Sequence, residues 1–205
     1  MSRLDLLVAT TNAGKFREFC TLLGDLRLDL RSLADCANAP EVAEDGGTYA
    51  ANALLKAETI ARWSGRAALA DDSGLEVDAL GGEPGVHSAR YAGTGQDSRA
   101  NVRKLLDALA GVAPEQRTAR FRCVVVVACP DGATLAAEGS CDGRIIDAPR
   151  GQEGFGYDPV FLDPASGLTF AEMSAAIKNC ISHRARACAR LREQLMPFLS
   201  AHAYP

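Results

Sequence analysis

The chain has 205 residues, of which 47% are hydrophobic and 23% charged, so it is long enough for one large domain or two lobes that share a sheet. This composition is typical of folded globular proteins and excludes a disordered chain. The formal net charge of −4 argues against nucleic acid as a partner, because binding its backbone requires clustered positive charge. A small polyanionic substrate remains compatible, since a few lysines and a metal ion can neutralise it locally.

The seven cysteines are odd in number and include no C-x-x-C pair. We therefore expect reduced thiols in the core of a cytoplasmic protein, rather than disulfides or a zinc site. The apolar core of residues 123–129 has the length of a strand and is too short to span a membrane, so we expect no membrane partner.

Residues 4–9 predict a first strand, and apolar residues at helical spacing after Gly14 predict a helix capped by Asn12. The intervening turn combines backbone N–H groups at a helix start with Lys15, which suits a phosphate. It is not a Walker loop, because Ala9 and Phe16 stand where that motif requires glycine and Ser or Thr. The alternative is a capped helix with a solvated lysine.

A second strand is predicted at residues 28–33, then a connecting loop at 34–47 and a helix capped by Thr48. Asn52 and Lys56 are four residues apart on this helix and share a face. For Asn52, a solvent or interhelical hydrogen bond is the more common role than a ligand contact. The apolar side of the helix is predicted to carry Tyr49, Ala53, Leu54, Ala57, Ile60 and Ala61.

Residues 68–70 predict a buried strand that we expect to end at Asp71 and Asp72, where Ser73 and Gly74 begin a loop. Open α/β sheets usually bind ligands at the carboxyl ends of strands. Two adjacent carboxylates repel one another unless a cation or a donor lies between them, which favours a hard metal ion or a proton in transit. The alternative is an ordinary turn, since Asp, Ser and Gly are common in turns.

A long loop is predicted at residues 74–95, followed by a helix that begins at Asp97 or Ser98. Residues 120–128 predict a strand, and the turn at 130–132 predicts that 134–141 pairs back on it as a hairpin. The sheet is therefore expected to be mixed rather than purely parallel.

The segment 151–158 is rich in glycine and contains Phe155 and Tyr157, so its backbone can approach a flat ligand while an aromatic ring stacks on it. A short strand is predicted at 160–162. Near the end of the chain, Ser182 is a good helix cap, which places His183 and Arg184 at the positive end of the last helix.

Six segments carry a resemblance to a known family. They are Thr10-Thr11-Asn12-Ala13-Gly14-Lys15, Asn52-Ala53-Leu54-Leu55-Lys56-Ala57, Asp71-Asp72-Ser73-Gly74-Leu75, Pro84-Gly85 with Ser88-Ala89-Arg90-Tyr91, Phe155-Gly156-Tyr157-Asp158-Pro159, and Lys178 with Ser182-His183-Arg184. In this order they resemble the inosine/xanthosine triphosphate pyrophosphatase family, whose members act on noncanonical purine nucleotides. Each segment alone is weak, whereas six in register over nearly the whole chain are specific.

The resemblance implies an elongated α/β fold, with a twisted mixed sheet flanked by helices and two lobes whose cleft holds the active site. It implies that residues 1–205 form a single pyrophosphatase domain without a separable linker. The implied reaction hydrolyses ITP, dITP or XTP between the α and β phosphates and releases pyrophosphate. The implied cofactor is Mg2+, and the implied assembly is a homodimer.

The resemblance also implies roles for individual residues. Thr10, Thr11, Asn12, Ala13, Gly14 and Lys15 would cradle the triphosphate. Asp72 would be the general base and, with Glu44, a magnesium ligand, while Ser73 would contact the substrate. Phe155, Gly156, Tyr157 and Asp158 would hold the base and sugar, and Lys178, His183 and Arg184 would complete the base and phosphate contacts.

The chain departs from the family pattern at Ala51, where many members carry a glutamate, and at Ala43, which precedes Glu44 and Asp45. Water or Asp71 would replace the missing carboxylate, or activity would be reduced. Two alternatives therefore stay open: a pyrophosphatase of standard or other modified nucleotides, and a nucleotide-binding sensor with attenuated catalysis. Selection against adenine would rest on donors such as His183 and Arg184 that address the oxygen at purine position 6.

Overall fold

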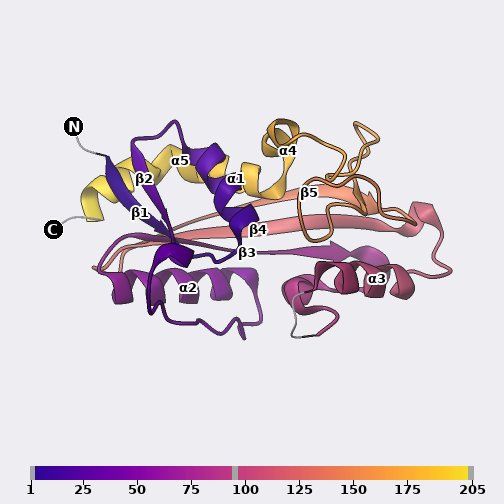
Figure 1. Ribbon diagram of the computed structural model, residues 1–205, viewed down its shortest axis with the longest axis horizontal. Coiled ribbons are helices and arrows are strands. Elements are labelled where there is room, and N and C mark those ends of the chain that lie inside the picture. Colours follow the sequence, from indigo (N-terminus) through magenta and orange to yellow (C-terminus); the bar gives the residue numbers. More distant parts are fainter. Residues whose placement is uncertain (1–2, 94–96, 203–205) are drawn as a thin grey trace. The chain divides into compact units, whose positions relative to one another are not determined.

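The computed structural model describes residues 3–93 and 97–202 (Figure 1). Within these residues it is a mixed α/β fold, with a six-stranded sheet in the order β2-β1-β3-β4-β5-β6. Its helices and strands are β1 (Leu4–Val8), α1 (Ala13–Leu23), β2 (Leu28–Ser32), α2 (Tyr49–Ser64), β3 (Ala68–Val77), α3 (Ser98–Ala108), β4 (Thr118–Ala128), β5 (Thr134–Ile145), β6 (Phe161–Leu162), α4 (Ala175–Ile181) and α5 (His183–His202).

The sheet is mixed, as the sequence predicts. β1 pairs in parallel with β2 and β3, whereas β5 and β6 are antiparallel. The Cys129 N–H donates to the carbonyl of Ala133 (2.9 Å) and closes the turn between β4 and β5. The predicted hairpin is therefore confirmed.

The chain forms two compact units. The described residues of unit 1 are 3–72, 123–139 and 184–202, and those of unit 2 are 73–93, 97–122 and 140–183. Each of β3, β4 and β5 contributes residues to both units, and the chain enters unit 1 for the last time between His183 and Arg184.

In unit 1, helices cover both faces of the strands (Figure 1): α1 and α5 lie on one face and α2 on the other. Phe19 of α1 and Leu191 of α5 pack in one hydrophobic cluster with Leu6 and Val125. Because both faces are covered, consecutive residues of the central strands are buried, which explains the nearly continuous apolar runs of β1 and β4.

The core of unit 2 is built around aromatic side chains. The ring of Phe121 lies 4.6 Å from that of Phe161, and Phe161 lies 4.9 Å from Phe170, measured between centroids. Leu105 of α3 and Ile145 of β5 pack in the same cluster. Tilted rings at these separations are a favourable arrangement for buried aromatic pairs.

Three details of the sequence prediction are wrong. β3 does not end at Asp71 and Asp72 but continues to Val77, because Leu75 and Val77 are buried and the carboxylate of Asp71 has cationic partners inside the fold. Consequently the first part of the predicted 74–95 loop is strand, and much of the rest forms the short 3-10 helices η2 (Asp78–Leu80) and η3 (Gly85–Arg90). Residues 94 and 95 lie outside the described residues. On α2, Leu54 is 38% exposed rather than buried, and Asn52 takes a buried position instead.

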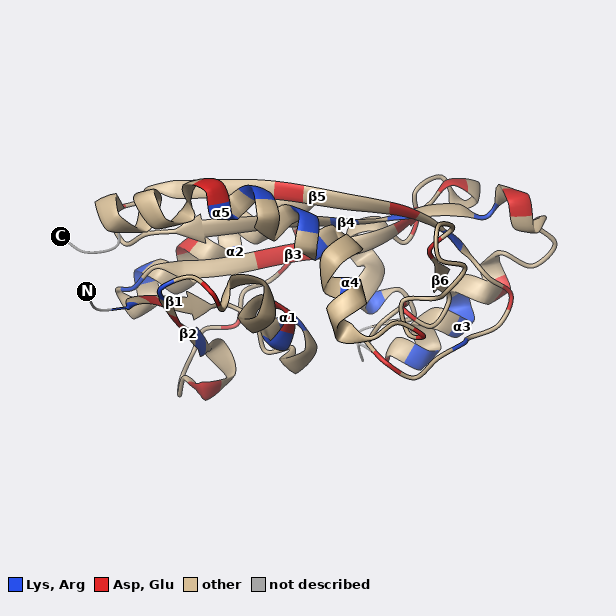
Figure 2. Ribbon diagram, turned by 90° about the horizontal axis from the view of Figure 1, so that it is seen from above, with Lys and Arg blue, Asp and Glu red and all other residues tan. Residues whose placement is uncertain are grey.

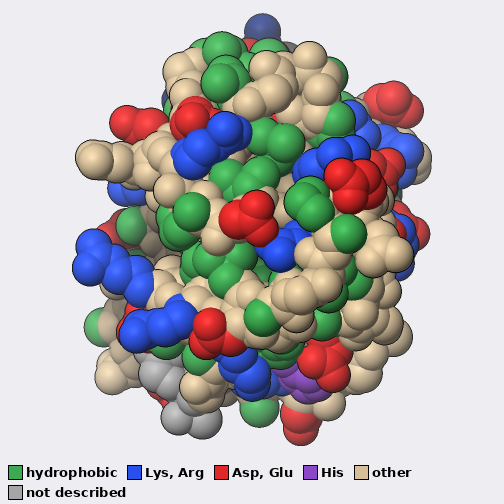
Figure 3. Space-filling view, turned by 90° about the vertical axis from the view of Figure 1, so that its right-hand side faces the viewer, with side chains coloured by type: hydrophobic (Ala, Val, Ile, Leu, Met, Phe, Trp, Pro, Cys, Tyr) green, Lys and Arg blue, Asp and Glu red, His purple; other side chains and the backbone are tan. Residues whose placement is uncertain are grey.

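Charged residues of both signs are spread along the chain (Figure 2), and the face shown in Figure 3 carries acidic and basic groups beside hydrophobic ones. This mixture agrees with the small net charge. In the described part of the chain, none of the helices has the length and apolar character needed to cross a membrane.

Candidate functional site

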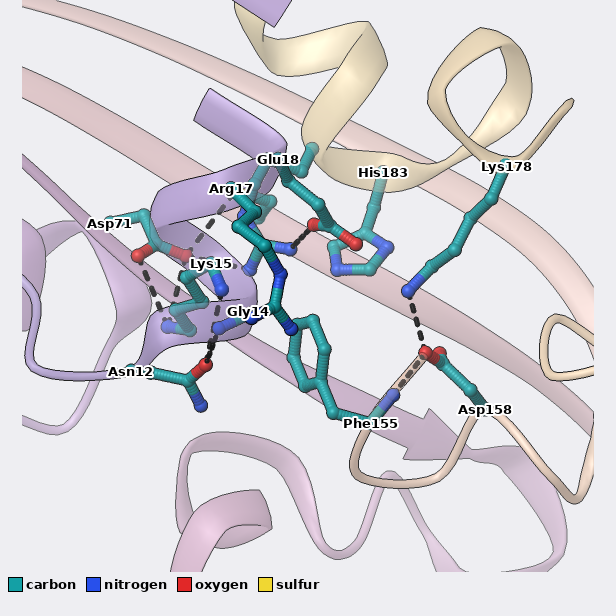
Figure 4. Close-up of polar contacts among 12 residues, drawn as sticks. Asn12, Gly14, Lys15, Arg17, Glu18, Asp71, Phe155, Asp158, Lys178 and His183 are labelled. Atoms are coloured by element: carbon teal, nitrogen blue, oxygen red, sulfur yellow. Dashed lines mark hydrogen bonds and ion pairs between the residues drawn. The ribbon is translucent and has the colours of Figure 1, made fainter. Parts of the chain in front are cut away.

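The turn between β1 and α1 has the predicted cap. The side-chain oxygen of Asn12 accepts hydrogen bonds from the N–H groups of Gly14 (2.8 Å) and Lys15 (3.0 Å) (Figure 4). Thr10 Oγ1 accepts a hydrogen bond from the Asn12 N–H (3.2 Å). The first turn of α1 carries no acidic side chain. Lys15 is therefore the charged residue of this first turn. Its positive charge and the positive end of the helix dipole together favour the binding of an anion.

Asp71 lies at the centre of an ion-pair network in unit 1. Its carboxylate contacts Lys15 Nζ at 3.0 Å and an Arg184 guanidinium nitrogen at 2.8 Å, and Arg184 also pairs with Glu18. Burial acts to raise the pKa of Asp71, but Lys15, Arg184 and Lys56 outweigh it and hold that pKa well below its usual range. Asp71 is thus a permanently charged anchor for two cations.

Asp72 has a different environment from its neighbour. It is 5% exposed, and one carboxylate oxygen accepts a hydrogen bond from Asn52 Nδ2 (2.8 Å). Asn52 is fixed in turn by the N–H of Gly46, which donates to its Oδ1 (2.8 Å). Burial raises the pKa of Asp72, and the charge of Glu44 adds to this effect. The hydrogen bond from Asn52 and the charges of Lys15 and Lys56 oppose it. A buried carboxylate with a raised pKa is better suited to accept a proton.

Lys56 connects the loop before α2 to β3. Its ammonium group forms an ion pair with Glu44 and donates a hydrogen bond to the carbonyl of Asp71 (3.0 Å). Burial would lower the pKa of Lys56, but Asp71 and Glu44 outweigh this and raise it, so the lysine stays charged. Among residues 3–93 and 97–202, no three His, Cys, Asp or Glu side chains form a ready-made metal site.

In unit 2, Asp158 organises the glycine-rich loop. Its Oδ2 accepts hydrogen bonds from the N–H of Phe155 (2.8 Å) and from Lys178 Nζ (2.6 Å) (Figure 4). Lys178 is buried and its Nζ lies 4.7 Å from the centroid of the Phe155 ring, within the range of a cation–π contact. Gly154 has φ +73°, and a Cβ there would lie 2.1 Å from Asp158 Oδ2, so only glycine permits this contact.

Tyr157 fixes the same loop to η3. Its hydroxyl donates to the carbonyl of Ser88 (2.9 Å), and Ser88 Oγ accepts a hydrogen bond from the Leu75 N–H (2.9 Å). Burial raises the pKa of Tyr157 well above its usual value, so the hydroxyl stays protonated. Tyr157 is 5% exposed, and its hydroxyl serves to attach the loop to η3. The preceding residue, Gly156, has a left-handed backbone with φ +62°.

The predicted pair His183 and Arg184 is found at the start of α5, and the extended backbone of Ser182 separates that helix from α4. The two side chains have different partners. The His183 ring stacks on Phe121 in unit 2, whereas Arg184 pairs with Asp71 and Glu18 in unit 1.

The structure also adds three residues to the site that sequence reasoning did not assign to it: Glu18, Asn52 and Lys56. The four-residue spacing of Asn52 and Lys56 was the available signal, because it indicates that both belong to one face of α2. Of the other predicted residues, Ala13 is the first residue of α1 and Thr11, two positions before it, is exposed. Ser73 follows Asp72 on β3 and is half-buried.

Comparison with known proteins identifies the class to which this fold and these residues belong. The model of the Ham1 family matches residues 6–194, and the chain therefore belongs to the Ham1 family. The solved structure of a HAM1 protein from Coxiella burnetii superposes with a TM-score of 0.85 at 38% identity, covering 95% of this chain and 99% of that one.

Curated relatives add a more particular name. A protein of Geobacillus kaustophilus named dITP/XTP pyrophosphatase is 54% identical over 190 residues, which is 93% of each chain. A protein of the same name from Shouchella clausii is 51% identical over 191 residues, covering 93% of this chain and 96% of the relative.

Proposed function

We propose that the protein hydrolyses the noncanonical purine nucleoside triphosphates ITP, dITP and XTP to the nucleoside monophosphate and pyrophosphate. The names of the relatives support this substrate class. The observation that carries the proposal is the pair Asp71 and Asp72 on β3, because the two adjacent carboxylates have different partners: Asp71 pairs with Lys15 and Arg184, whereas Asp72 accepts a hydrogen bond from Asn52. The opposite directions of their pKa shifts agree with a division into a charged anchor and a proton acceptor.

The triphosphate is assigned to residues of unit 1. Lys15 and Lys56 supply positive charge, and the start of α1 contributes the positive end of a helix dipole. Asp71 holds Lys15 in place through its ion pair, so the ammonium group is oriented before the substrate arrives. Preorganised charge of this kind stabilises the negative charge that develops during phosphoryl chemistry.

Magnesium is the proposed cofactor, and the residues present fit it. Glu44 raises the pKa of Asp72, a repulsion between carboxylates that a divalent cation relieves. Mg2+ is commonly held by one or two carboxylates together with substrate phosphates, so Glu44 and Asp72 suffice without a third protein ligand. When bound, the ion would neutralise phosphate charge.

Asp72 is the proposed general base. Its carboxylate is buried, and Asn52 holds one of its oxygens in a fixed orientation, so the group is positioned to accept a proton. We propose that Asp72 takes a proton from the attacking water as the bond between the α and β phosphates breaks. General base catalysis by a positioned group contributes roughly 10²–10⁴-fold in rate.

The purine and sugar are assigned to residues of unit 2. Phe155 offers an aromatic face, and Asp158 and Lys178 hold its backbone and ring in place. His183 is the proposed donor to the 6-oxo group that hypoxanthine and xanthine share and adenine lacks. Rejection of guanine would rest on an unsatisfied 2-amino group, since an unpaired buried polar group costs about 1–3 kcal/mol.

We further propose that the protein is a cytoplasmic homodimer. The cytoplasmic assignment is supported by the odd number of cysteines and the lack of a C-x-x-C pair in the sequence, which favour reduced thiols. The homodimer rests on the family resemblance alone.

Ala51 motivates the alternative of a nucleotide-binding sensor. It stands where many members of the resembling family have a glutamate, and it is an exposed position on α2 whose N–H donates to the capping oxygen of Thr48. A panel of nucleotides in saturating magnesium separates the possibilities. The proposal expects turnover of ITP, dITP and XTP above ATP, GTP, CTP and UTP, whereas a sensor would bind ITP tightly without turnover.

A further inference from the structure

His183 is held in a fixed plane by an aromatic partner. Its ring stacks on Phe121 with centroids 4.7 Å apart and an interplanar angle of 16°. Phe121 itself packs against Phe161 and Phe170, so the platform beneath the imidazole is part of the core of unit 2. His183 is 5% exposed. The stacking covers one face of the imidazole and fixes the plane in which its two nitrogens lie.

One edge of that ring meets a thiol. Cys141 of β5 is buried, and its Sγ lies 3.9 Å from His183 Nδ1, within hydrogen-bonding distance for sulfur. In a neutral imidazole, one nitrogen carries the proton and the other accepts a hydrogen bond. The partner of Nδ1 therefore influences whether Nε2 is a donor or an acceptor.

Two considerations indicate which group carries the proton. A thiol has a proton to donate and only a weakly accepting sulfur, whereas a bare imidazole nitrogen accepts hydrogen bonds well. Burial of both side chains disfavours the alternative thiolate–imidazolium pair, because it would place two charges in an apolar environment. Both considerations favour a hydrogen bond in which the S–H of Cys141 donates to an unprotonated Nδ1 of His183.

We propose that Cys141 is a positioning residue that holds His183 in the tautomer with a proton on Nε2, and thereby determines specificity for 6-oxopurines. The specificity part rests on the function proposed above. An Nε2–H can donate a hydrogen bond to the 6-oxo oxygen of hypoxanthine or xanthine. Adenine has an amino group at that position, which is itself a donor and cannot accept this bond. A site built to donate to a substrate oxygen rejects an analogue that lacks the acceptor.

The tautomer can be measured without any substrate. Long-range ¹H–¹⁵N spectra of the uniformly ¹⁵N-labelled full chain distinguish a protonated ring nitrogen from a bare one, and a His183→Gln variant assigns the signals among the three histidines. We expect a bare Nδ1 and a protonated Nε2 at neutral pH. A proton on Nδ1 alone, or protons on both nitrogens with a thiolate absorbance, would overturn the proposal.

Substitutions at Cys141 then link the tautomer to specificity. Cys141→Ala removes the donor, and we expect a mixture of tautomers and a fall of about tenfold or more in the ratio of kcat/KM for ITP to that for ATP. Cys141→Ser retains a donor and should restore both readouts. Cys129→Ala is the matched control, because Cys129 is a buried cysteine of unit 1 outside the site, and it should change neither.

The two proposals fail in distinguishable ways. If Cys141→Ala leaves the tautomer or the ITP-to-ATP ratio unchanged while the wild type hydrolyses ITP, the positioning role of Cys141 is wrong. If the wild type shows the expected tautomer but hydrolyses no ITP, the proposed function and the specificity role fail together, and only the tautomer assignment stands.

Discussion

Asn52 donates a hydrogen bond of 2.8 Å from its side-chain nitrogen to the carboxylate of Asp72, twenty residues further along the chain. This bond joins α2 to β3 inside unit 1 and opposes the effect of burial on the pKa of Asp72. It therefore influences both the orientation of the proposed base and the pH range in which that base is ionised.

Asn52→Ala should shift the acid limb of the activity profile to higher pH. The bond stabilises the charged form of Asp72, so its loss raises the pKa of that carboxyl and less of it is ionised at a given acidic pH. We also expect kcat/KM for ITP to fall roughly 10–100-fold, because a buried acceptor loses its partner. The measurement is kcat/KM against pH, with Leu54→Ala on the exposed side of α2 as the control. An unchanged acid limb would contradict the role of Asn52.

Asp72→Asn should abolish turnover while leaving the fold intact. The amide has nearly the shape of the carboxylate but cannot accept the proton of the attacking water, so we expect a loss of roughly 10²–10⁴-fold in kcat. Circular dichroism and ITP binding would show whether the folded state is retained. Near-normal rates would remove Asp72 from its role as base.

Glu44→Gln should weaken the affinity of the enzyme for magnesium rather than lower its stability. The substitution removes a carboxylate from the proposed pair of metal ligands while keeping an oxygen that Lys56 can contact. We expect the magnesium concentration for half-maximal activity to rise about tenfold or more, as measured by titration with ITP in excess. If the same titration curve is obtained for the variant and the wild type, Glu44 is not a magnesium ligand.

Asp71→Asn should destabilise the protein most clearly at neutral pH. The substitution leaves Lys15 and Arg184 without their shared anion, and breaking a buried ion pair in this way costs about 3–5 kcal/mol. The pKa of Asp71 is lowered on folding, so its contribution is fully present above the pKa of an unfolded aspartate, about 3.9, and is lost as the pH falls below it.

Urea unfolding of the wild type and Asp71→Asn at neutral pH and at about pH 3 measures this difference. The gap between their unfolding free energies should narrow on acidification. A gap that stays constant would mean that the charge of Asp71 does not stabilise the fold.

Gly151→Ala should impair nucleotide binding through the glycine-rich loop. Gly151 has φ +81°, and a Cβ there would lie 2.1 Å from the carbonyl oxygen of Ala171, which also accepts hydrogen bonds from the N–H groups of Gln152 and Glu153. The backbone must shift, and with it the segment that carries Phe155. We expect a higher KM for ITP in steady-state kinetics.

Gly132→Ala is the matched control for that variant. Gly132 has a similar left-handed conformation, φ +90°, in the turn between β4 and β5, and no atom lies within 4 Å of the added Cβ. It should cost about 1 kcal/mol of stability with an unchanged KM. If the two variants changed KM equally, backbone strain rather than displacement of the loop would be responsible.

Much of the fold was predictable because periodicity and capping are local properties. The Asn12 cap, the hairpin turn at 130–132 and most of the helices and strands follow from short stretches of sequence, whereas helix α4 is not among the predicted elements. The predicted end of β3 comes too early because two adjacent aspartates are typical of the point where a strand leaves a sheet. Only distant cations, Lys15 and Arg184, allow Asp71 to be buried within the strand.

The partners within the site were less predictable. Asn52 to Asp72, Lys56 to Glu44 and Glu18 to Arg184 are contacts between distant positions, and nothing local in the sequence specifies them. The same holds for His183, whose stacking on Phe121 depends on the position of β4 beside the start of α5. The residue types indicate that phosphate binding and proton transfer are possible, whereas tertiary contacts determine which hydrogen-bond or ion-pair partner each side chain has.

The most direct test of the proposed function is the identity of the phosphate products formed from ITP in saturating magnesium. Phosphorus NMR of a completed reaction should show IMP and pyrophosphate in equal amounts, because the bond between the α and β phosphates is the one proposed to break. Orthophosphate released directly from ITP, with IDP and without pyrophosphate, would contradict the account.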